Sequence, residues 1–306
     1  MVRVLVIGAT GYIGHAVCAA LRRSNHRVYG LARSQEKAKV LAKKEVIIIN
    51  GSVEGGEYAK AVETHGIDVV IDLSGTPSTH KILEELMPIA KSRINSGQYK
   101  LGFIYCSGIW VHGSSAEQVN DFDVVGKSYK KVDLVTWRPI VEQAILDSRD
   151  LLDVAVIRPG LVYGGTGSIW SSAFGPLAQA VAKKDASVSI PYSDDVMFNL
   201  VHVEDTAEAF RLAVEKVSVL SGAHPVFDLI TSYENSRALL NAAGKAFGYK
   251  GDIKYDGPGD DLLFKALNTT VNTNSQRAIA LLGWSPSKYS MTADIDIYVS
   301  SWAADL

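Results

Sequence analysis

The 306-residue sequence predicts an α/β protein built on a doubly wound parallel sheet. Short apolar runs rich in Val and Ile alternate with helical patterns. The apolar runs are residues 2–7, 28–31, 46–49, 69–73, 101–105 and 154–157. Such runs are typical of strands buried on both faces of a sheet. The intervals carry helical patterns at residues 12–23, 35–43, 57–65, 80–95 and 139–148. Strands that alternate with helices form right-handed crossover units, which build a parallel sheet.

The alternation ends after Ile157, and this break predicts a second domain. Gly, Ser and scattered aromatic residues follow over 160–200, and then the pattern predicts a strand, a helix and a strand between 200 and 230. We expect a nucleotide-binding domain and a smaller, mostly helical substrate-binding domain. The first takes residues 1–160 plus about 203–230, and the second takes 161–202 and 231–306.

The composition excludes several classes of function. With 31 Lys and Arg against 33 Asp and Glu, the net charge of -2 gives no support to a nucleic-acid partner or an anionic membrane. The two cysteines, Cys18 and Cys106, lie in apolar segments, so we expect neither a disulfide framework nor a metal site. No apolar run approaches the ~18 residues of a membrane span. A strand-like run that begins at Val2 leaves no room for a signal peptide, and we expect a cytoplasmic protein.

The segment Gly8–Gly14 (GATGYIG) predicts a binding site for a dinucleotide. It follows a strand and opens a helix, the context that makes a G-x-x-G-x-x-G pattern specific rather than an ordinary turn with three glycines. The first glycine permits a tight turn, the second lets the backbone approach a pyrophosphate, and the third lets helix and strand pack closely. The helix N-terminus then presents free N–H groups to the phosphates. The predicted contacts in this Rossmann-type turn are Gly8, Thr10, Gly11, Tyr12, Ile13 and Gly14.

The end of the second strand indicates NADP(H) rather than NAD(H). An NAD site usually has an acidic residue there, about 20 residues beyond the motif, which bonds the ribose hydroxyls. This strand ends in Leu31-Ala32-Arg33-Ser34 without an acid. Arg33 offers a planar donor group for a 2′-phosphate, and Ser34 offers a further donor. The alternative is that Arg33 is a solvated residue at the start of a loop.

With five later segments added, the chain resembles an extended short-chain dehydrogenase/reductase of the NAD-dependent epimerase/dehydratase group. The segments are Asn50-Gly51-Ser52-Val53, Leu73-Ser74-Gly75, Arg158–Gly164 (RPGLVYG), Val201–Asp205 (VHVED) and Leu281–Pro286 (LLGWSP). The resemblance covers nearly the whole length. It implies further cofactor contacts from Ser52, Val53, Leu73, Ser74, Gly75, Pro159, Gly160 and Leu161.

The predicted active site departs from the family pattern. Family members use a Ser or Thr, a Tyr, a Lys four residues after the Tyr, and a Glu four residues later. Glu142 fits that Glu, which puts Arg138 at the Lys position and Leu134 at the Tyr position, and YxxxK occurs nowhere in the sequence. Pro139 is tolerated in the first turn of a helix but not in its interior, so we expect a helix that begins near Arg138.

The segment Tyr105–Gly113 (YCSGIWVHG) resembles the family's SSxxVYG run, but it puts Gly108 at the catalytic Ser position and Ser107 one residue earlier. Reduction of a carbonyl needs a proton donor or charge stabilisation at the developing alkoxide. The candidates for this role are Ser107, His112 and Tyr163. His112 is best matched to neutral pH, and its alternative role is purely structural.

Three further basic or phenolic side chains bear on the predicted site. Arg138 can bond the nicotinamide ribose as the family's Lys does, but it cannot be tuned by deprotonation. Tyr129 could enter from a loop, and we expect it at the surface. His202 lies in a predicted buried strand, where we expect a structural role.

The substrate is predicted to be an apolar or aromatic small molecule, because four aromatic residues lie near loops expected over the cofactor: Trp110, Trp137, Trp170 and Phe174. Three functions remain open. The first is an NADP(H)-dependent reductase or dehydrogenase that acts on a hydrophobic carbonyl or alcohol. The second is a non-redox isomerase or lyase on the same scaffold, and the third is a catalytically inactive NADP(H)-binding sensor. The resemblance implies that a homodimer is possible through the helices that flank the fourth and fifth strands.

Overall fold

A computed structural model describes residues 1–122, 131–220 and 222–304 of the chain. Its centre is a seven-stranded sheet of order β10-β6-β5-β4-β1-β2-β3, in which every neighbouring pair is parallel. The strands are β1 Arg3–Ile7, β2 Arg27–Ala32, β3 Ile47–Asn50, β4 Val69–Asp72, β5 Leu101–Cys106, β6 Leu152–Pro159 and β10 Val226–Leu229. The predicted doubly wound fold is confirmed, because the strand order reverses between β1 and β4.

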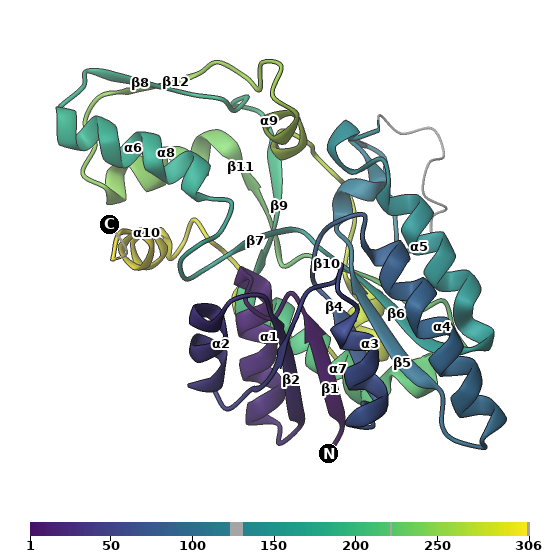
Figure 1. Cartoon of the computed structure of the whole chain (residues 1–306). Coiled ribbons are helices and arrows are strands. Elements are labelled where there is room, and N and C mark those ends of the chain that lie inside the picture. Colours follow the sequence, from purple (N-terminus) through teal and green to yellow (C-terminus); the bar gives the residue numbers. More distant parts are fainter. Residues whose placement is uncertain (123–130, 221, 305–306) are drawn as a thin grey trace.

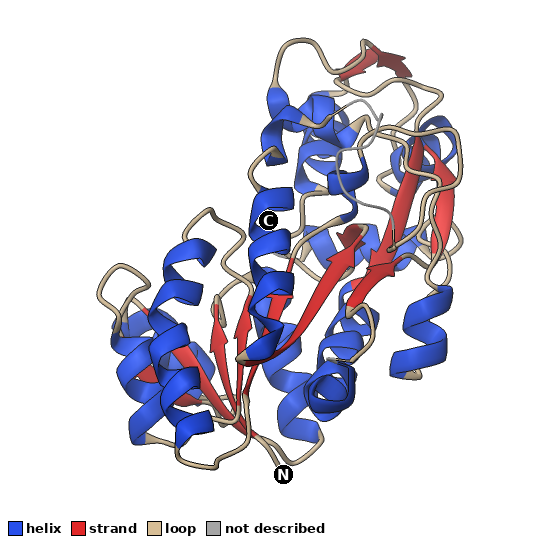
Figure 2. Ribbon diagram, turned by 90° about the vertical axis from the view of Figure 1, so that its right-hand side faces the viewer, coloured by secondary structure: helices blue, strands red, loops and turns tan. Residues whose placement is uncertain are grey.

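Helices cover both faces of this sheet, as Figures 1 and 2 show. The core on one face is formed with α1 Tyr12–Arg23, α2 Gln35–Ala42 and α7 Val203–Leu220. The core on the other face is formed with α3 Glu57–Thr64, α4 Thr79–Asn95 and α5 Arg138–Asp147. The expected start of α5 at Arg138 is confirmed, with Pro139 in the first turn. No helix in the described ranges is long and apolar enough to cross a membrane.

A second, smaller unit lies beyond the carboxyl ends of the sheet (Figures 1 and 2). It combines a three-stranded sheet with a two-stranded one: β7 Leu161–Tyr163, β9 Met197–His202 and β11 Ser232–Asn235 form the first, and β8 Ser187–Ile190 and β12 Asp252–Tyr255 form the second. Its helices are α6 Ser171–Lys183, α8 Ser236–Ala246, α9 Leu262–Leu267 and α10 Ile295–Ala303. Its core is aromatic, and Trp170 and Phe174, expected near the substrate, are each only 2% exposed within it.

The glycine turn between β1 and α1 depends on the close approach of two backbone segments. Gly8 has a φ of +82°, a conformation that favours glycine, and the Gly11 N–H donates to the Gly8 carbonyl oxygen at 2.9 Å. A Cβ on Gly14 would lie 2.1 Å from that same oxygen. This contact sets how closely α1 packs on β1, and it places the N-terminus of α1 at the carboxyl edge of the sheet.

A Gly14→Ala substitution should therefore destabilise the fold by about 3 kcal/mol, because a rigid backbone oxygen has to move. Gly175→Ala in α6 is the matched control, since a Cβ at Gly175 meets no atom within 4 Å. That change should leave stability within ~1 kcal/mol of the native value or raise it. Urea unfolding of both variants checks the prediction, and equal stability of the two would contradict it.

Candidate functional site

A cavity of about 310 Å³ lies over the glycine turn, at the carboxyl ends of β1 to β4. The predicted cofactor contacts that line it are Gly8, Thr10, Gly11, Arg33, Ser52, Val53, Leu73 and Ser74. Its other lining residues were not singled out from the sequence, and they are Ile7, Leu31, Lys37, Glu54, Thr76 and Ser78. The glycine turn and the ends of four neighbouring strands thus meet at one cavity.

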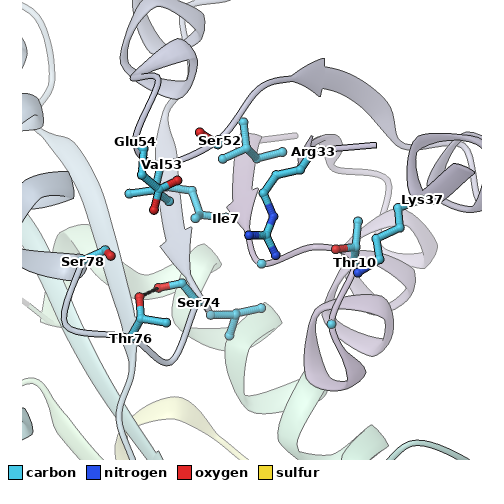
Figure 3. A pocket seen from close by; sticks show the side chains of 14 residues that line it. Ile7, Thr10, Arg33, Lys37, Ser52, Val53, Glu54, Ser74, Thr76 and Ser78 are labelled. Carbon is cyan, nitrogen blue, oxygen red and sulfur yellow. Dashed lines mark hydrogen bonds between the residues drawn. The ribbon is translucent and has the colours of Figure 1, made fainter. Parts of the chain in front are cut away.

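Two cations lie on one side of this first cavity. Figure 3 shows the Arg33 side chain reaching into it, with Lys37 beside Thr10 and Glu54 on the opposite side. Lys37 lies in the first turn of α2, where the helix follows directly on Arg33 and Ser34. The pKa of the Glu54 carboxyl is lowered, chiefly by hydrogen bonds from its own backbone amide and the Ser52 hydroxyl, and to a smaller extent by Arg33. The cavity can therefore hold an anion beside Arg33 and Lys37.

Ser34, predicted as a donor to the same anion, has a local task. Its Oγ accepts a hydrogen bond from the Lys37 backbone N–H at 3.3 Å and so caps α2. Ser34 is absent from the cavity lining. The cap fixes the first turn of α2, and with it the helical position from which Lys37 reaches the cavity.

The N-terminus of α1 suits the phosphates of a dinucleotide. Gly11 occupies the N-cap position and has no side chain that could bond the first N–H groups of the helix. Those groups carry the positive end of the helix dipole and are left for a ligand. A Cβ on Gly8 would meet the Leu73 backbone at 2.8 Å, so the cradle admits no larger residue there. The residues present therefore fit a dinucleotide.

A second cavity of about 230 Å³ lies at the ends of β4, β5 and β6. The predicted site residues that line it are Tyr12, Ile13, Leu73, Gly75, Ser107, Arg138, Pro159, Gly160 and Leu161. The remaining lining residues are Cys106, Gly108, Ile109, Trp110, Val162 and Ile169. Leu73 lines both cavities, so the two are neighbours along the sheet edge.

The polar groups of this second cavity are few. The Ser107 Oγ and the Arg138 Nε are buried without a hydrogen-bond partner among the described residues. A Cβ on Gly108 would lie 2.6 Å from Arg138 Nη1, so the missing side chain admits the guanidinium. The Tyr12 hydroxyl donates to the Gly164 carbonyl oxygen at 2.5 Å, and burial raises the pKa of the Cys106 thiol to about 12. Ser107 and Arg138 are thus left to meet a ligand.

Two candidate proton donors lie away from both cavities. The His112 side chain is 1% exposed, and its Nε2 lies 2.8 Å from Asp228 Oδ2. The Tyr163 hydroxyl donates to the Lys288 carbonyl oxygen at 3.4 Å, and its ring packs against His202 and Tyr298 in the core of the second unit. Burial raises the pKa of Tyr163. Tyr129 lies outside the described residues.

His112 belongs to a buried ionic cluster behind the second cavity. Arg158 Nη2 and Nε lie 2.6 and 3.1 Å from the two carboxylate oxygens of Glu142, and Arg158 Nη1 lies 3.6 Å from Asp228 Oδ1. Burial acts to raise the pKa of Asp228, but His112 and Arg158 outweigh it and the pKa is lowered. Glu142 and Arg158 belong to recognisable motifs, whereas Asp228 carries no signal in the sequence.

Metal ligands do not gather anywhere in the described part of the chain. No group of three or more His, Cys, Asp or Glu side chains there could hold a metal ion.

Comparison with known proteins shows what the sequence is similar to. Residues 4–117 match the model of the NAD dependent epimerase/dehydratase family. The uncharacterized protein YLL056C of Saccharomyces cerevisiae is 28% identical over 222 residues, which are 70% of this chain and 71% of that protein. Acryloyl-coenzyme A reductase of Metallosphaera sedula is 34% identical over 83 residues, 27% of this chain and 24% of that protein.

Solved structures share the fold over the whole chain. dTDP-glucose 4,6-dehydratase of Bacillus anthracis, in complex with NAD, has a TM-score of 0.78 at 14% identity and covers 100% of this chain and 97% of its own. The human epimerase family protein SDR39U1, with NADPH, has a TM-score of 0.66 at 17% identity. The match covers 97% of this chain and 99% of that protein. The protein therefore has the extended short-chain dehydrogenase/reductase fold. The match to the NAD dependent epimerase/dehydratase family lies in residues 4–117, the first part of that fold.

Asp121, which borders the ionic cluster, gives a prediction about pH. Its Oδ1 lies 3.0 Å from Arg277 Nε, its Oδ2 accepts the Asp228 N–H at 3.3 Å, and burial together with the charge of Asp228 raises its pKa to about 6. The folded protein thus holds this proton more tightly than the unfolded chain. The stability that the proton gives is present below the unfolded pKa and is lost as the pH rises through the folded pKa.

We therefore expect the free energy of unfolding of the native protein, relative to Asp121→Asn, to fall by at most ~3 kcal/mol between about pH 4 and pH 6.5. Groups that both proteins share cancel in this difference. Urea unfolding at several pH values measures it. A difference that stays constant across the range, or one that grows with pH, would contradict the prediction.

Proposed function

We propose that the protein is an NADP(H)-dependent reductase or dehydrogenase that acts on an apolar or aromatic small molecule with a carbonyl or alcohol group. One observation carries the proposal. A polar cavity with two cations at the glycine turn adjoins a mostly apolar cavity that contains unpartnered donors. A dinucleotide has the same order of groups, with phosphates and adenosine at one end and the reactive ring at the other.

The cofactor would be held by residues along the whole edge of the sheet. The first turn of α1 would bind the pyrophosphate, Ser52 and Val53 would flank the adenine, and Arg33 and Lys37 would bind a 2′-phosphate. When bound, the nicotinamide supplies or accepts a hydride, and the protein supplies position and electrostatics. Two cations and the absence of an acid at the end of β2 favour the phosphorylated cofactor. The NADPH bound by the fold neighbour SDR39U1 is consistent with this choice.

Ser107 and Arg138 would act on the oxygen of the substrate. The Arg138 guanidinium stabilises negative charge that develops there, and because it stays protonated it does not act as the acid. The Ser107 hydroxyl can donate a hydrogen bond to that oxygen, and the proton that completes the alcohol would come from solvent. We assign no contact with the reacting atoms to His112 or Tyr163, because neither lines the cavity.

The body of the substrate would lie against apolar side chains. Ile13, Ile109, Trp110, Leu161 and Ile169 form most of the remaining wall of the second cavity. Burial of an apolar surface against them supplies binding free energy, while the few polar groups fix orientation. An apolar or aromatic body with one oxygen function matches this lining.

The preference for NADP(H) is tested by removing each cation beside the first cavity, which lies over the glycine turn. Arg33→Ala and Lys37→Ala should each weaken NADPH binding about 10- to 100-fold, the worth of a charge-assisted hydrogen bond. NADH binding should change less than about threefold. Lys39→Ala, an exposed position on α2 outside the cavity, is the matched control. Calorimetric titration gives the dissociation constants, and equal losses for the two cofactors would contradict the preference.

The reaction class is tested with NADPH deuterated on the nicotinamide and an extract of native-host metabolites. Mass spectrometry should find deuterium in a metabolite for the native protein. Ser107→Ala and Arg138→Gln should lower the rate at least ~100-fold, as loss of an oxyanion donor does, with NADPH affinity kept within tenfold. Ser96→Ala, at the end of α4, is the control.

The other outcomes of this experiment separate the alternatives. A metabolite that changes while the label stays on the cofactor indicates an isomerase or lyase and contradicts a reductase. NADPH that binds without any metabolite changing indicates a sensor. Full turnover by both cavity variants would remove Ser107 and Arg138 from the mechanism.

A further inference from the structure

We propose that His112 is a positioning residue whose bond to Asp228 fixes the turn that presents Ser107 and Gly108 to the guanidinium of Arg138. This inference rests on the proposed function in one respect, namely that Ser107 and Arg138 are the groups that meet the substrate. It gives His112 a positioning role instead of the proton-donor role considered from the sequence, and an experiment can distinguish these two roles.

The hydrogen bond of His112 to Asp228 fixes the orientation of its ring. His112 ends the short 3₁₀ helix Ile109–His112, and its Nε2 lies 2.8 Å from Asp228 Oδ2. The Thr273 hydroxyl donates to the same oxygen at 2.7 Å, and the side chain of Asp228 is fully buried. Because a carboxylate only accepts, Nε2 carries a hydrogen and donates it. A buried, charge-assisted bond of this kind holds the ring in place.

The turn that carries Ser107 is anchored at both of its ends. The Ser107 backbone N–H donates to the Ile157 carbonyl oxygen at 2.8 Å, which ties the beginning of the turn to β6. The His112 side chain ties the end of the turn to β10 through Asp228. Between the two anchors, Gly108, Ile109 and Trp110 line the second cavity. The position of this cavity wall therefore depends on the bond between His112 and Asp228.

The same cluster also holds the helix that carries Arg138. Glu142 lies four residues after Arg138, so the two share a face of α5. Arg158 binds both carboxylate oxygens of Glu142, and its Nη1 lies 3.6 Å from Asp228 Oδ1 and 3.5 Å from His112 Nε2. Asp228 and Arg158 therefore join the Ser107 turn to the start of α5.

The spacing between these two parts leaves little tolerance. Arg138 Nη1 lies where it would be 2.6 Å from a Cβ on Gly108. A small displacement of the turn would therefore move the guanidinium or open a gap beside it. His112 sets this spacing from behind the cavity wall, since it is buried and is not among the lining residues.

Three variants test the proposal. His112→Leu fills the space and removes the donor, His112→Gln keeps an N–H donor near the position of Nε2, and His26→Leu is the matched control. His26 is also buried, and its Nε2 lies 3.1 Å from a carboxylate oxygen of Glu215, far from the cavity. The first readout is hydrogen–deuterium exchange of the backbone amides of residues 107–113, measured without cofactor. The others are the dissociation constant of NADPH and, with the substrate found by deuterium transfer, kcat and KM.

We expect His112→Leu to speed exchange in residues 107–113 at least tenfold and to lower kcat at least tenfold, with NADPH affinity within threefold of the native protein. His112→Gln should restore both quantities to within about threefold. His26→Leu should leave exchange in this segment unchanged. If His112→Leu does not fold, Asp228→Asn weakens the same bond by removing the charge, and it should speed exchange in the same segment.

Two results would overturn the proposal. Native exchange in residues 107–113 of His112→Leu, or of Asp228→Asn in its place, would mean that the bond does not fix the turn. Loss of kcat in His112→Gln with native exchange would mean that the imidazole itself takes part in proton transfer. Exchange does not depend on a cofactor, so an absence of NADPH binding or hydride transfer would count against the proposed function alone.

Discussion

The close approach of helix α1 to strand β1 at Gly8 and Gly14 is the constraint on which the rest of the site depends. A Cβ on Gly14 would lie 2.1 Å from the Gly8 carbonyl oxygen, so only glycine permits this packing. The packing brings the N-terminus of α1 to the carboxyl edge of the sheet. Leu73, at the end of β4, lies against the same turn and lines both cavities. One backbone contact thus sets both the position of the α1 N-terminus and the boundary between the two cavities.

The far end of the site depends on buried charge. The family that the sequence resembles has a Tyr and a Lys where this chain has Leu134 and Arg138. A guanidinium keeps its proton, so Arg138 holds charge but does not tune a neighbouring acid. The ionic cluster of His112, Glu142, Arg158 and Asp228 holds the helix of Arg138 through Glu142 and is buried. A site that stabilises charge through a fixed guanidinium requires such rigid support, because misplaced donors lose most of their effect.

Much of the fold and of the lining of the first cavity could be predicted from the sequence. The central strands are apolar on both faces, and Pro139 marked the start of α5 in the right place. Other features depended on contacts that no local pattern contains. The partner of His112 is 116 residues away in β10, and the direction of Ser107 could not be predicted because successive strand residues face opposite ways. Trp170 and Phe174 were expected near the substrate but fill the core of the second unit. Lys37 was missed, although the turn of α2 that carries it follows directly on Arg33.

The central claim is that a nicotinamide dinucleotide spans both cavities, from Arg33 to Arg138. Saturation-transfer NMR of the native protein with NADP⁺ tests it most directly, because the adenine and nicotinamide protons report separately on the two ends of the molecule. We predict strong saturation of the adenine and nicotinamide protons of NADP⁺. Addition of NADPH as a competitor should remove the NADP⁺ signals. Saturation of the adenine protons alone would contradict the account, because the second cavity would then not be a nicotinamide site.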